Sequence, residues 1–220
     1  MPSYNVLRAD FHIHSYFSAD SNMSPEKIVK VAKEKGLDVI AVTDHNSIRG
    51  GLEVKKIAKN LIVFVGAEIK TNEGEVIGIN LKKDIEPFLS LVETCELIKK
   101  QGALVFVPHP FDAFRDGVGK AIEKINAYID AVEVFNARVL LKKFNREAYN
   151  FAKAHNLPFF AGSDAHFESE IGAVYMLINA KKDENDILKA IKERKVEING
   201  EKTGIKPHWK TFVTKMSKKI

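Results

Sequence analysis

The stretch Val6–Ser15, VLRADFHIHS, begins the pattern that decides the fold. Its first part, Val6–Ile13, is apolar at alternate positions and predicts a strand. The segment Ser24–Lys35 predicts a helix, because a serine and a proline stand where helices begin and a glycine follows its end. The short apolar segment Asp38–Thr43 predicts the next strand. A strand, a helix and a strand in this order are typical of a mostly parallel sheet that is covered by helices.

The same alternation continues along the chain. Further strands are expected at Leu61–Glu68, Glu75–Leu81, Ala103–Val107, Ala131–Phe135, Pro158–Gly162, Ala173–Ile178 and Val196–Asn199. Further helices are expected at Leu52–Lys59, Pro87–Gln101, Val118–Tyr128, Lys142–Asn156 and Glu184–Lys195. Both an open doubly wound sheet and a closed barrel fit this α/β pattern. About seven strand-helix units favour the barrel, and no nucleotide-binding glycine motif follows a strand.

The length of 220 residues fits a single domain, 1–220, and no stretch has the composition of a linker. The segment from about 205 to 220 is rich in lysine and contains the only tryptophan, Trp209, so we expect a terminal appendage there. No apolar run is long enough for a signal peptide or a membrane span, so we expect a cytoplasmic protein with no membrane partner.

Composition narrows the chemistry. The chain has 34 Lys and Arg residues against 29 Asp and Glu residues, a formal net charge of +5. This modest excess could favour acidic substrates or nucleic acid, but it establishes neither. The single cysteine, Cys95, excludes a disulfide framework and a cysteine-built zinc site, and its place on an apolar helical stripe predicts a core residue.

Five of the seven histidines lie at the ends of predicted strands, each beside or near an acidic residue. The histidines are His12, His14, His45, His109 and His166, and the acids are Asp10, Asp20, Asp44, Glu68 and Asp164. Because the carboxyl ends of parallel strands share one face, we expect these side chains to converge on one pocket. His12 and His14 are two positions apart in a strand, so their side chains should point the same way.

Imidazole together with carboxylate is the ligand set of zinc, manganese or iron, whereas calcium prefers oxygen alone. The candidate ligands outnumber those that one tetrahedral ion needs, so we expect two or three divalent ions, with a carboxylate such as Glu68 able to bridge two of them. Clustered ions polarise a phosphoryl group and produce hydroxide near neutral pH. Hydrolysis of a phosphate ester is therefore the reaction class that the cluster indicates.

At these residues the sequence resembles the PHP family (polymerase and histidinol phosphatase), a group of metal-dependent phosphoesterases. The matching motifs are DFHIHS at 10–15, TDHN at 43–46, the histidine of VPHP at 107–110 and SDAH at 163–166. The similarity runs from about Arg8 to Gly172 and is closest to short, stand-alone members. The resemblance implies a distorted (β/α)7 TIM-like barrel and up to three bound metal ions.

The resemblance also implies which residues bind each ion. The first ion would be held by His12, His14, Glu68 and Asp164, the second by Asp20, His45 and His166, and the third by Glu68 and His109. Catalysis would rest on His12, His14, Glu68, Asp164 and His166. Many family members supply a further histidine to the third ion, and Ile77 stands at the position where we expect that histidine. The third site should then be weak, absent, or completed by water or substrate.

Other residues are expected to support the metal ligands or the substrate. Asp10 and Asp44 match motif positions outside the ligand set, and each should accept a hydrogen bond from a ligand imidazole. Arg115 and Arg138 follow strand ends, and their planar guanidinium groups make them our candidates for binding the substrate phosphate. His208 lies in the terminal appendage and is given no role in the site.

The sequence thus predicts a metal-dependent phosphoesterase that hydrolyses a phosphomonoester, a nucleotide or an oligonucleotide end through hydroxide activated on a bi- or trinuclear metal cluster. Its partner would be a phosphorylated small molecule or a nucleotide. The alternative is a non-catalytic nucleic-acid-binding subunit on the same barrel, which the basic pI near 9.1 would suit. Because relatives of that kind lack the metal ligands, the presence of nearly every ligand here favours the enzyme.

Overall fold

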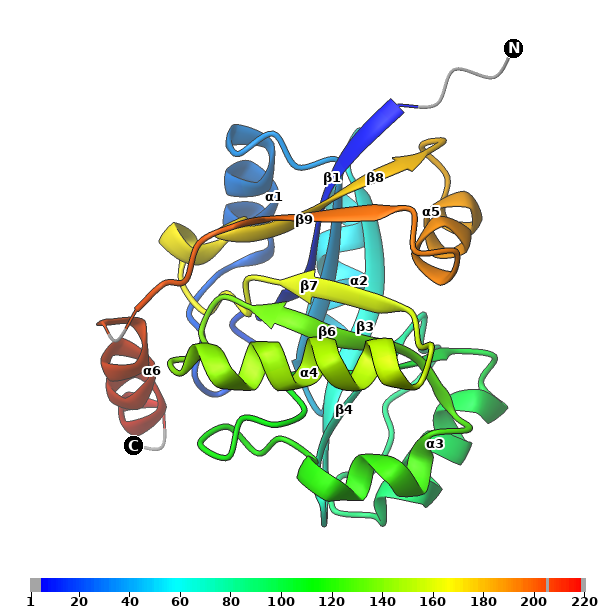
Figure 1. Cartoon of the computed structure of the whole chain (residues 1–220). Coiled ribbons are helices and arrows are strands. Elements are labelled where there is room, and N and C mark those ends of the chain that lie inside the picture. The colour runs from blue at the N-terminus through cyan, green and yellow to red at the C-terminus, as the bar shows by residue number, and fades with distance from the viewer. Residues whose placement is uncertain (1–4, 205, 219–220) are drawn as a thin grey trace.

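A computed structural model describes residues 5–204 and 206–218. A nine-stranded sheet forms the centre of the molecule, and helices cover its outside (Figure 1). The strands are β1 (Asn5–Ile13), β2 (Val39–His45), β3 (Ile62–Thr71), β4 (Gly74–Ile79), β5 (Leu104–Val107), β6 (Ile129–Asn136), β7 (Phe159–Gly162), β8 (Val174–Ala180) and β9 (Val196–Gly200). The α-helices are α1 (Pro25–Glu34), α2 (Arg49–Ile57), α3 (Leu91–Lys100), α4 (Lys142–Ala154), α5 (Glu184–Lys192) and α6 (Lys206–Ser217).

The sheet curls until it nearly closes. Its strand order is β7-β6-β5-β4-β3-β2-β1-β8-β9, and β7 returns to β1 where Ile13 pairs with Ala165. The amide of His14 donates to the carbonyl oxygen of Ala165 at 2.8 Å, and the amide of Ala165 donates to the carbonyl oxygen of His12 at 3.2 Å. These bonds join the carboxyl ends of β1 and β7, and they confirm the predicted distorted TIM-like barrel.

The sheet is less parallel than the alternation predicted. β4 runs antiparallel to both β3 and β5, because a turn at 72–73, and not a helix, connects β3 to β4. β8 likewise runs antiparallel to β1 and to β9. Parallel pairing is confined to β1, β2 and β3 and to β5, β6 and β7. The carboxyl ends of these six strands still lie at one end of the barrel, as the sequence predicted for the site.

Local sequence explains where most helices begin. The Ser24 side chain accepts a hydrogen bond from the Lys27 amide, so α1 begins as predicted. α3 begins at Leu91, later than predicted, because Ser90 is the residue that caps it. The predicted helix over Val118–Tyr128 is only a short 3-10 helix, η1 (Gly119–Ile125).

Phenylalanine side chains fill the barrel interior beneath the site. The ring centroids of Phe11 and Phe64 lie 5.1 Å apart, and those of Phe106 and Phe160 lie 4.8 Å apart. All four rings are fully buried and belong to one apolar cluster with Ile77. Offset aromatic contacts of this kind add to the free energy of burial, so the stack forms a firm floor under the polar residues above it.

The predicted terminal appendage is a helix that packs on the barrel. α6 lies at the end of the barrel where β6 and β7 terminate (Figure 1). The Nε2 atom of His208 lies 2.9 Å from the carbonyl oxygen of Arg138, and Nζ of Lys218 contacts the loop that follows β1. Ile205, Lys219 and Ile220, which belong to the predicted appendage, lie outside the described residues. Within the described part of the chain, none of the helices has the length and hydropathy needed to span a membrane.

Candidate metal centre

The barrel brings all eight predicted metal ligands to one end. They are His12 from β1, His14 just after it, Asp20 from the same loop, His45 from β2, Glu68 from β3, His109 after β5, and Asp164 and His166 after β7. The pairing of β1 with β2 shifts register between Asp10 and Ile13. Neighbouring residues of a regular strand point to opposite faces, but an irregularity in pairing changes the direction of side chains. Here the register shift lets both Phe11 and His12 face the barrel interior.

Glu68 lies at the centre of the cluster. Its Oε1 atom is 3.0 Å from Nε2 of His109 and 3.5 Å from Nε2 of His12. Its Oε2 atom is 3.2 Å from Nδ1 of His45 and 3.4 Å from Nε2 of His14. Each carboxylate oxygen therefore faces two imidazoles, which is the arrangement that a carboxylate bridging two cations requires.

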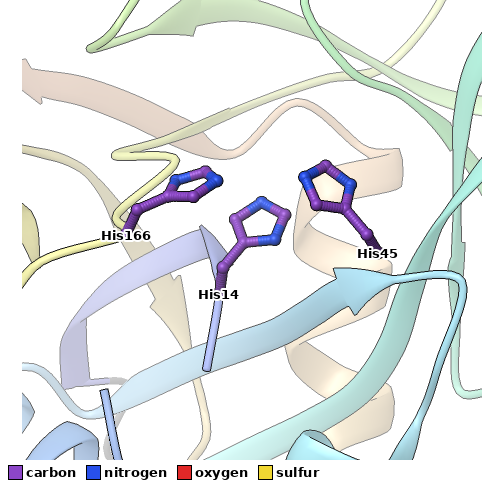
Figure 2. Close-up of side chains that lie close together, drawn as sticks. All are labelled: His14, His45 and His166. Atoms are coloured by element: carbon purple, nitrogen blue, oxygen red, sulfur yellow. The ribbon is translucent and has the colours of Figure 1, made fainter. Parts of the chain in front are cut away.

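Asp20 and Asp164 are two further acids that lie against the imidazoles of the cluster. The Asp164 Oδ1 atom lies 3.4 Å from Nε2 of His14 and 3.7 Å from Nε2 of His12. The Asp20 carboxylate lies 3.4 Å from Nε2 of His45 and 3.4 Å from Nε2 of His166. The rings of His14, His45 and His166 point toward one another, as Figure 2 shows. Residues from distant parts of the sequence, such as His12 and Asp164, thus meet in one polar pocket.

Buried atoms in the cluster lack hydrogen-bond partners among the described residues. They include Nε2 of His12 and His14, Oε2 of Glu68, and Oδ1 of Asp20 and of Asp164. A buried polar atom without a partner costs about 1–3 kcal/mol, so several such atoms in one place indicate a ligand that satisfies them together. Three groups of side chains have donor atoms close enough for a metal ion: His12–His14–Asp164, His14–His45–His166 and Glu68–Glu75–His109. The donor set fits divalent cations.

Glu75 is a candidate ligand that the sequence analysis missed. It lies on β4 beside Glu68 and His109, and it is 8% exposed. Ile77, where a histidine was expected, packs in the apolar interior two residues further along the same strand. Alternate residues of a strand share a face, so Glu75 and Ile77 both face the inside of the barrel. Ile77 lies deeper, and Glu75 reaches the pocket. The alternation itself was the signal that could have identified Glu75.

Glu133 and Asn136, both on β6, are buried supports that the sequence analysis also missed. Glu133 Oε1 is 3.1 Å from Nδ1 of His12, and Glu133 Oε2 accepts from the backbone amide of His109 at 2.8 Å. Nδ2 of Asn136 donates to both Glu133 and Asp164 at 2.9 Å. A proton on Nδ1 of His12 that is donated to Glu133 leaves Nε2 free to bind a metal. The sequence signal was an acid in the middle of an apolar strand.

Asp44 and Asp10 support the loops of the site and do not contact the imidazoles directly. Asp44 accepts from the Ser18 hydroxyl at 2.7 Å, and that hydroxyl lies 3.2 Å from Nδ1 of His14, so Asp44 reaches a ligand through Ser18. Asp10 accepts from the amide and hydroxyl of Ser163 and from the amides of His12 and Gly172. These hydrogen bonds correct the expectation for both acids, because the loop after β7 uses the Asp10 carboxylate and Asp44 reaches His14 only through Ser18.

Arg115 and Arg138 lie beside the cluster. Arg115 forms an ion pair with Asp164, and its Nη1 donates to Asn136 at 3.2 Å. Arg138 is buried, with Nε 3.3 Å from Glu170 and Nη1 2.7 Å from Nδ1 of His166. Both arginines line a cavity of about 230 Å³ that also borders Asp20, His45 and His166. The structure thus brings both predicted phosphate-binding arginines to the metal-ligand cluster.

The electrostatics of two predicted ligands, His14 and Asp164, favour the forms that bind a cation. Burial lowers the pKa of His14, and the neighbouring imidazoles of His166 and His45 lower it further, to well below its usual value. Burial alone would raise the pKa of Asp164, but the Arg115 guanidinium together with the imidazoles of His12, His14 and His166 holds it well below its usual range. A neutral imidazole and an ionised carboxylate are the forms that bind cations.

Two candidate ligands have strained backbones. His109 has a φ of 26° and Asp164 has a φ of 55°, both in the left-handed region that side chains rarely adopt. Such conformations cost about 1–3 kcal/mol and gather at functional sites. Here each one turns its side chain back over the end of the barrel, toward Glu68 for His109 and toward His14 for Asp164.

Comparisons with known proteins agree with this geometry. The model of a family described as PHP-associated matches residues 142–196. An uncharacterized protein of Methanocaldococcus jannaschii is 46% identical over 143 residues, which cover 60% of this chain and 82% of that protein. The chain belongs to the PHP family. A two-domain protein from Bacteroides vulgatus, containing a predicted PHP-like metal-dependent phosphoesterase, has a similar structure, with a TM-score of 0.76 and 22% identity. That match covers 90% of this PHP protein and 66% of the other chain.

A more distant PHP relative has a named activity. The 5'-3' exoribonuclease of Haemophilus influenzae is 28% identical over 156 residues, which cover 67% of this chain and 52% of the exoribonuclease. The match therefore spans about half the length of that enzyme.

Proposed function

We propose that this PHP protein is a metal-dependent phosphoesterase that hydrolyses a phosphomonoester, a nucleotide or an oligonucleotide end. The observation that carries the proposal is the position of Glu68, whose two carboxylate oxygens each face two imidazoles in a buried pocket with unpartnered polar atoms. Two arginines line the cavity that borders this pocket. Metal ligands and phosphate-binding groups in contact are what phosphate ester hydrolysis needs.

Zinc, manganese or iron fits the mixed nitrogen and oxygen donors. The proposed ligand sets are His12, His14, Glu68 and Asp164 for one ion, Asp20, His45 and His166 for a second, and Glu68, Glu75 and His109 for a third. When bound, such ions neutralise phosphoryl oxygens and lower the pKa of water. The third set differs from the sequence expectation in that Glu75 completes it.

The residues of the chain supply orientation and charge. Arg115 and Arg138 would bind the phosphoryl oxygens, since their guanidinium groups line the cavity and are held in place by Asp164 and Glu170. Glu133 would hold the Nδ1 proton of His12 and so keep Nε2 directed at the ligand set. Fixed donors cost no reorganisation when charge develops on the phosphate, which is how such a site accelerates hydrolysis.

The non-catalytic alternative, a nucleic-acid-binding subunit, is less well supported. It predicts loss of metal ligands, whereas all eight predicted ligands are present and converge. The exoribonuclease relative supports keeping oligonucleotide ends among the substrates to be tested.

A substrate panel tests the proposed function. An aryl phosphate, nucleoside monophosphates and a phosphorylated oligonucleotide would be incubated with the protein in Mn²⁺, Zn²⁺ and Mg²⁺. We expect phosphate release from at least one substrate, and a loss of at least about a hundredfold in the doubly substituted His12→Ala, His14→Ala variant. The control is His155→Ala, because His155 stacks on Phe151 and lies outside the cluster. Absence of hydrolysis with every metal, or full activity in the double variant, would overturn the proposal.

A further inference from the structure

The cavity beside the metal-ligand cluster has two walls of different origin. Asp20, His45, His166 and the two arginines line it from the barrel. His208, Thr211 and Lys215 line it from α6, the helix that the sequence analysis treated as an appendage. The C-terminal helix is therefore part of the pocket, and it stands over the ends of strands that carry the candidate ligands.

Both ends of α6 are attached to the site. Near its start, Nε2 of His208 lies 2.9 Å from the carbonyl oxygen of Arg138, and the Arg138 guanidinium donates to the Thr211 hydroxyl. Just past its end, Nζ of Lys218 donates to three carbonyl oxygens, those of Tyr16 and Ser18 at 2.9 Å and that of Ser21 at 2.5 Å.

The Lys218 contact is specific. An ammonium group has three N–H donors, and here all three have backbone acceptors in the loop that also carries Asp20. The lysine therefore connects the end of α6 to a loop that supplies a candidate metal ligand. We use the term latch for this contact between Lys218 and the loop 16–21.

The cavity is small and partly open to solvent. Its volume of about 230 Å³ is below the roughly 300–1,000 Å³ of most small-molecule pockets, so a phosphoryl group and a compact leaving group would fill it. Lys215 lines the cavity, so a cation is available at the α6 wall. The chemistry of the two walls suits a small anionic ester better than a polymer.

We propose that α6 is a specificity wall, held by the Lys218 latch, that admits small phosphomonoesters to the metal centre and excludes oligonucleotides. The proposal rests on the proposed function, and it narrows the substrate class. It also assigns roles to Lys218 and Lys215, which lie outside the predicted metal and phosphate sites.

Binding to the metal-loaded protein tests the wall separately from catalysis. The probes are a fluorescent 5'-phosphorylated octanucleotide, followed by anisotropy, and inorganic phosphate, followed by calorimetry. The variants are Lys218→Met, a chain that ends at Gly204, and the control Lys192→Met on the exposed side of α5. Lys218→Met keeps the alkyl chain and removes only the charged group, so it tests the latch even if the shortened chain fails to fold.

We expect the octanucleotide to bind both altered proteins at least about tenfold more tightly than the full chain, because the barrier is removed. In Lys218→Met the phosphate affinity should change by less than about fivefold, since Lys218 is an exposed lysine that does not line the cavity. The control should match the full chain. Equal octanucleotide affinity in the full chain and both variants would overturn the proposal that α6 excludes oligonucleotides. If the binding results are as expected but no substrate is hydrolysed, the proposed function is wrong, whereas the exclusion of oligonucleotides by α6 is confirmed.

Discussion

At the scale of single residues, hydrogen bonds to one nitrogen of an imidazole determine which nitrogen is free to bind a metal. Nδ1 of His12 is engaged by Glu133 and Nδ1 of His14 by Ser18, which leaves both Nε2 atoms directed at carboxylates. The protonation site of an imidazole follows from the partner of its other nitrogen. Residues outside the ligand set therefore decide how well the ligands can bind a cation.

The role of Glu133 leads to a prediction for metal affinity. Glu133→Gln should weaken metal binding by about 10–100-fold, because it removes the charge that orients His12 and braces the backbone of His109. Calorimetric titration with Mn²⁺ measures the effect. The matched control is Glu147→Gln on the exposed side of α4, and similar affinities in both variants would contradict the role.

Glu75 leads to a separate prediction for metal stoichiometry. Replacing it by Gln should lower the bound metal by about one equivalent while the other ions stay, because a neutral amide is a poor substitute for a carboxylate ligand. Elemental analysis after desalting measures this. Glu73→Gln is the control, since Glu73 lies in the preceding turn and pairs with Lys124. An unchanged metal content in Glu75→Gln would exclude Glu75 from the ligand set.

At the scale of elements, the strand ends carry the site and the aromatic interior keeps them in place. Phe106 on β5 lies within 4.8 Å of Phe160 on β7 and 6.2 Å of Phe11 on β1, measured between ring centroids. The stack thus connects three strands whose ends, or the loops that follow them, supply candidate ligands. The packing of these buried rings therefore helps to keep the strand ends aligned.

This packing predicts a large effect on stability. Phe106→Ala should lower the free energy of unfolding by about 3–5 kcal/mol, because it removes a buried ring and leaves a cavity. Phe88, which is 70% exposed, is the control. Phe88→Ala should change the free energy of unfolding by less than about 0.5 kcal/mol. Urea unfolding measures both, and equal losses would show that the interior stack is not a principal support.

Sequence patterns predicted these elements well where the information was local. The alternation in Val6–Ile13 and the cap at Ser24 identified β1 and α1. The direction of β4 follows from the turn at 72–73 that connects it to β3, a local feature that the alternation of strands and helices does not encode. The register shift at the end of β1 and the late start of α3 at Leu91 depend on contacts that alternation does not encode.

At the scale of the whole molecule, the predicted site residues converge because the sheet closes. His12 and Asp164 are far apart in sequence, and the pairing of Ile13 with Ala165 brings them together. The motifs therefore identified side chains that converge at one end of the barrel. The supports Glu133 and Asn136 and the wall formed by α6 were missed, because their partners become evident only when the barrel is formed.

The central claim is that this barrel end binds a cluster of divalent ions through the predicted histidines and acids. The most direct measurement is elemental analysis of protein that has been loaded with Mn²⁺ and desalted, compared with the doubly substituted His12→Ala, His14→Ala variant. We predict at least two equivalents in the natural protein, given three candidate ligand groups, and a loss of at least about one in the variant. Less than about a tenth of an equivalent in the natural protein, or equal metal content in both proteins, would contradict the claim.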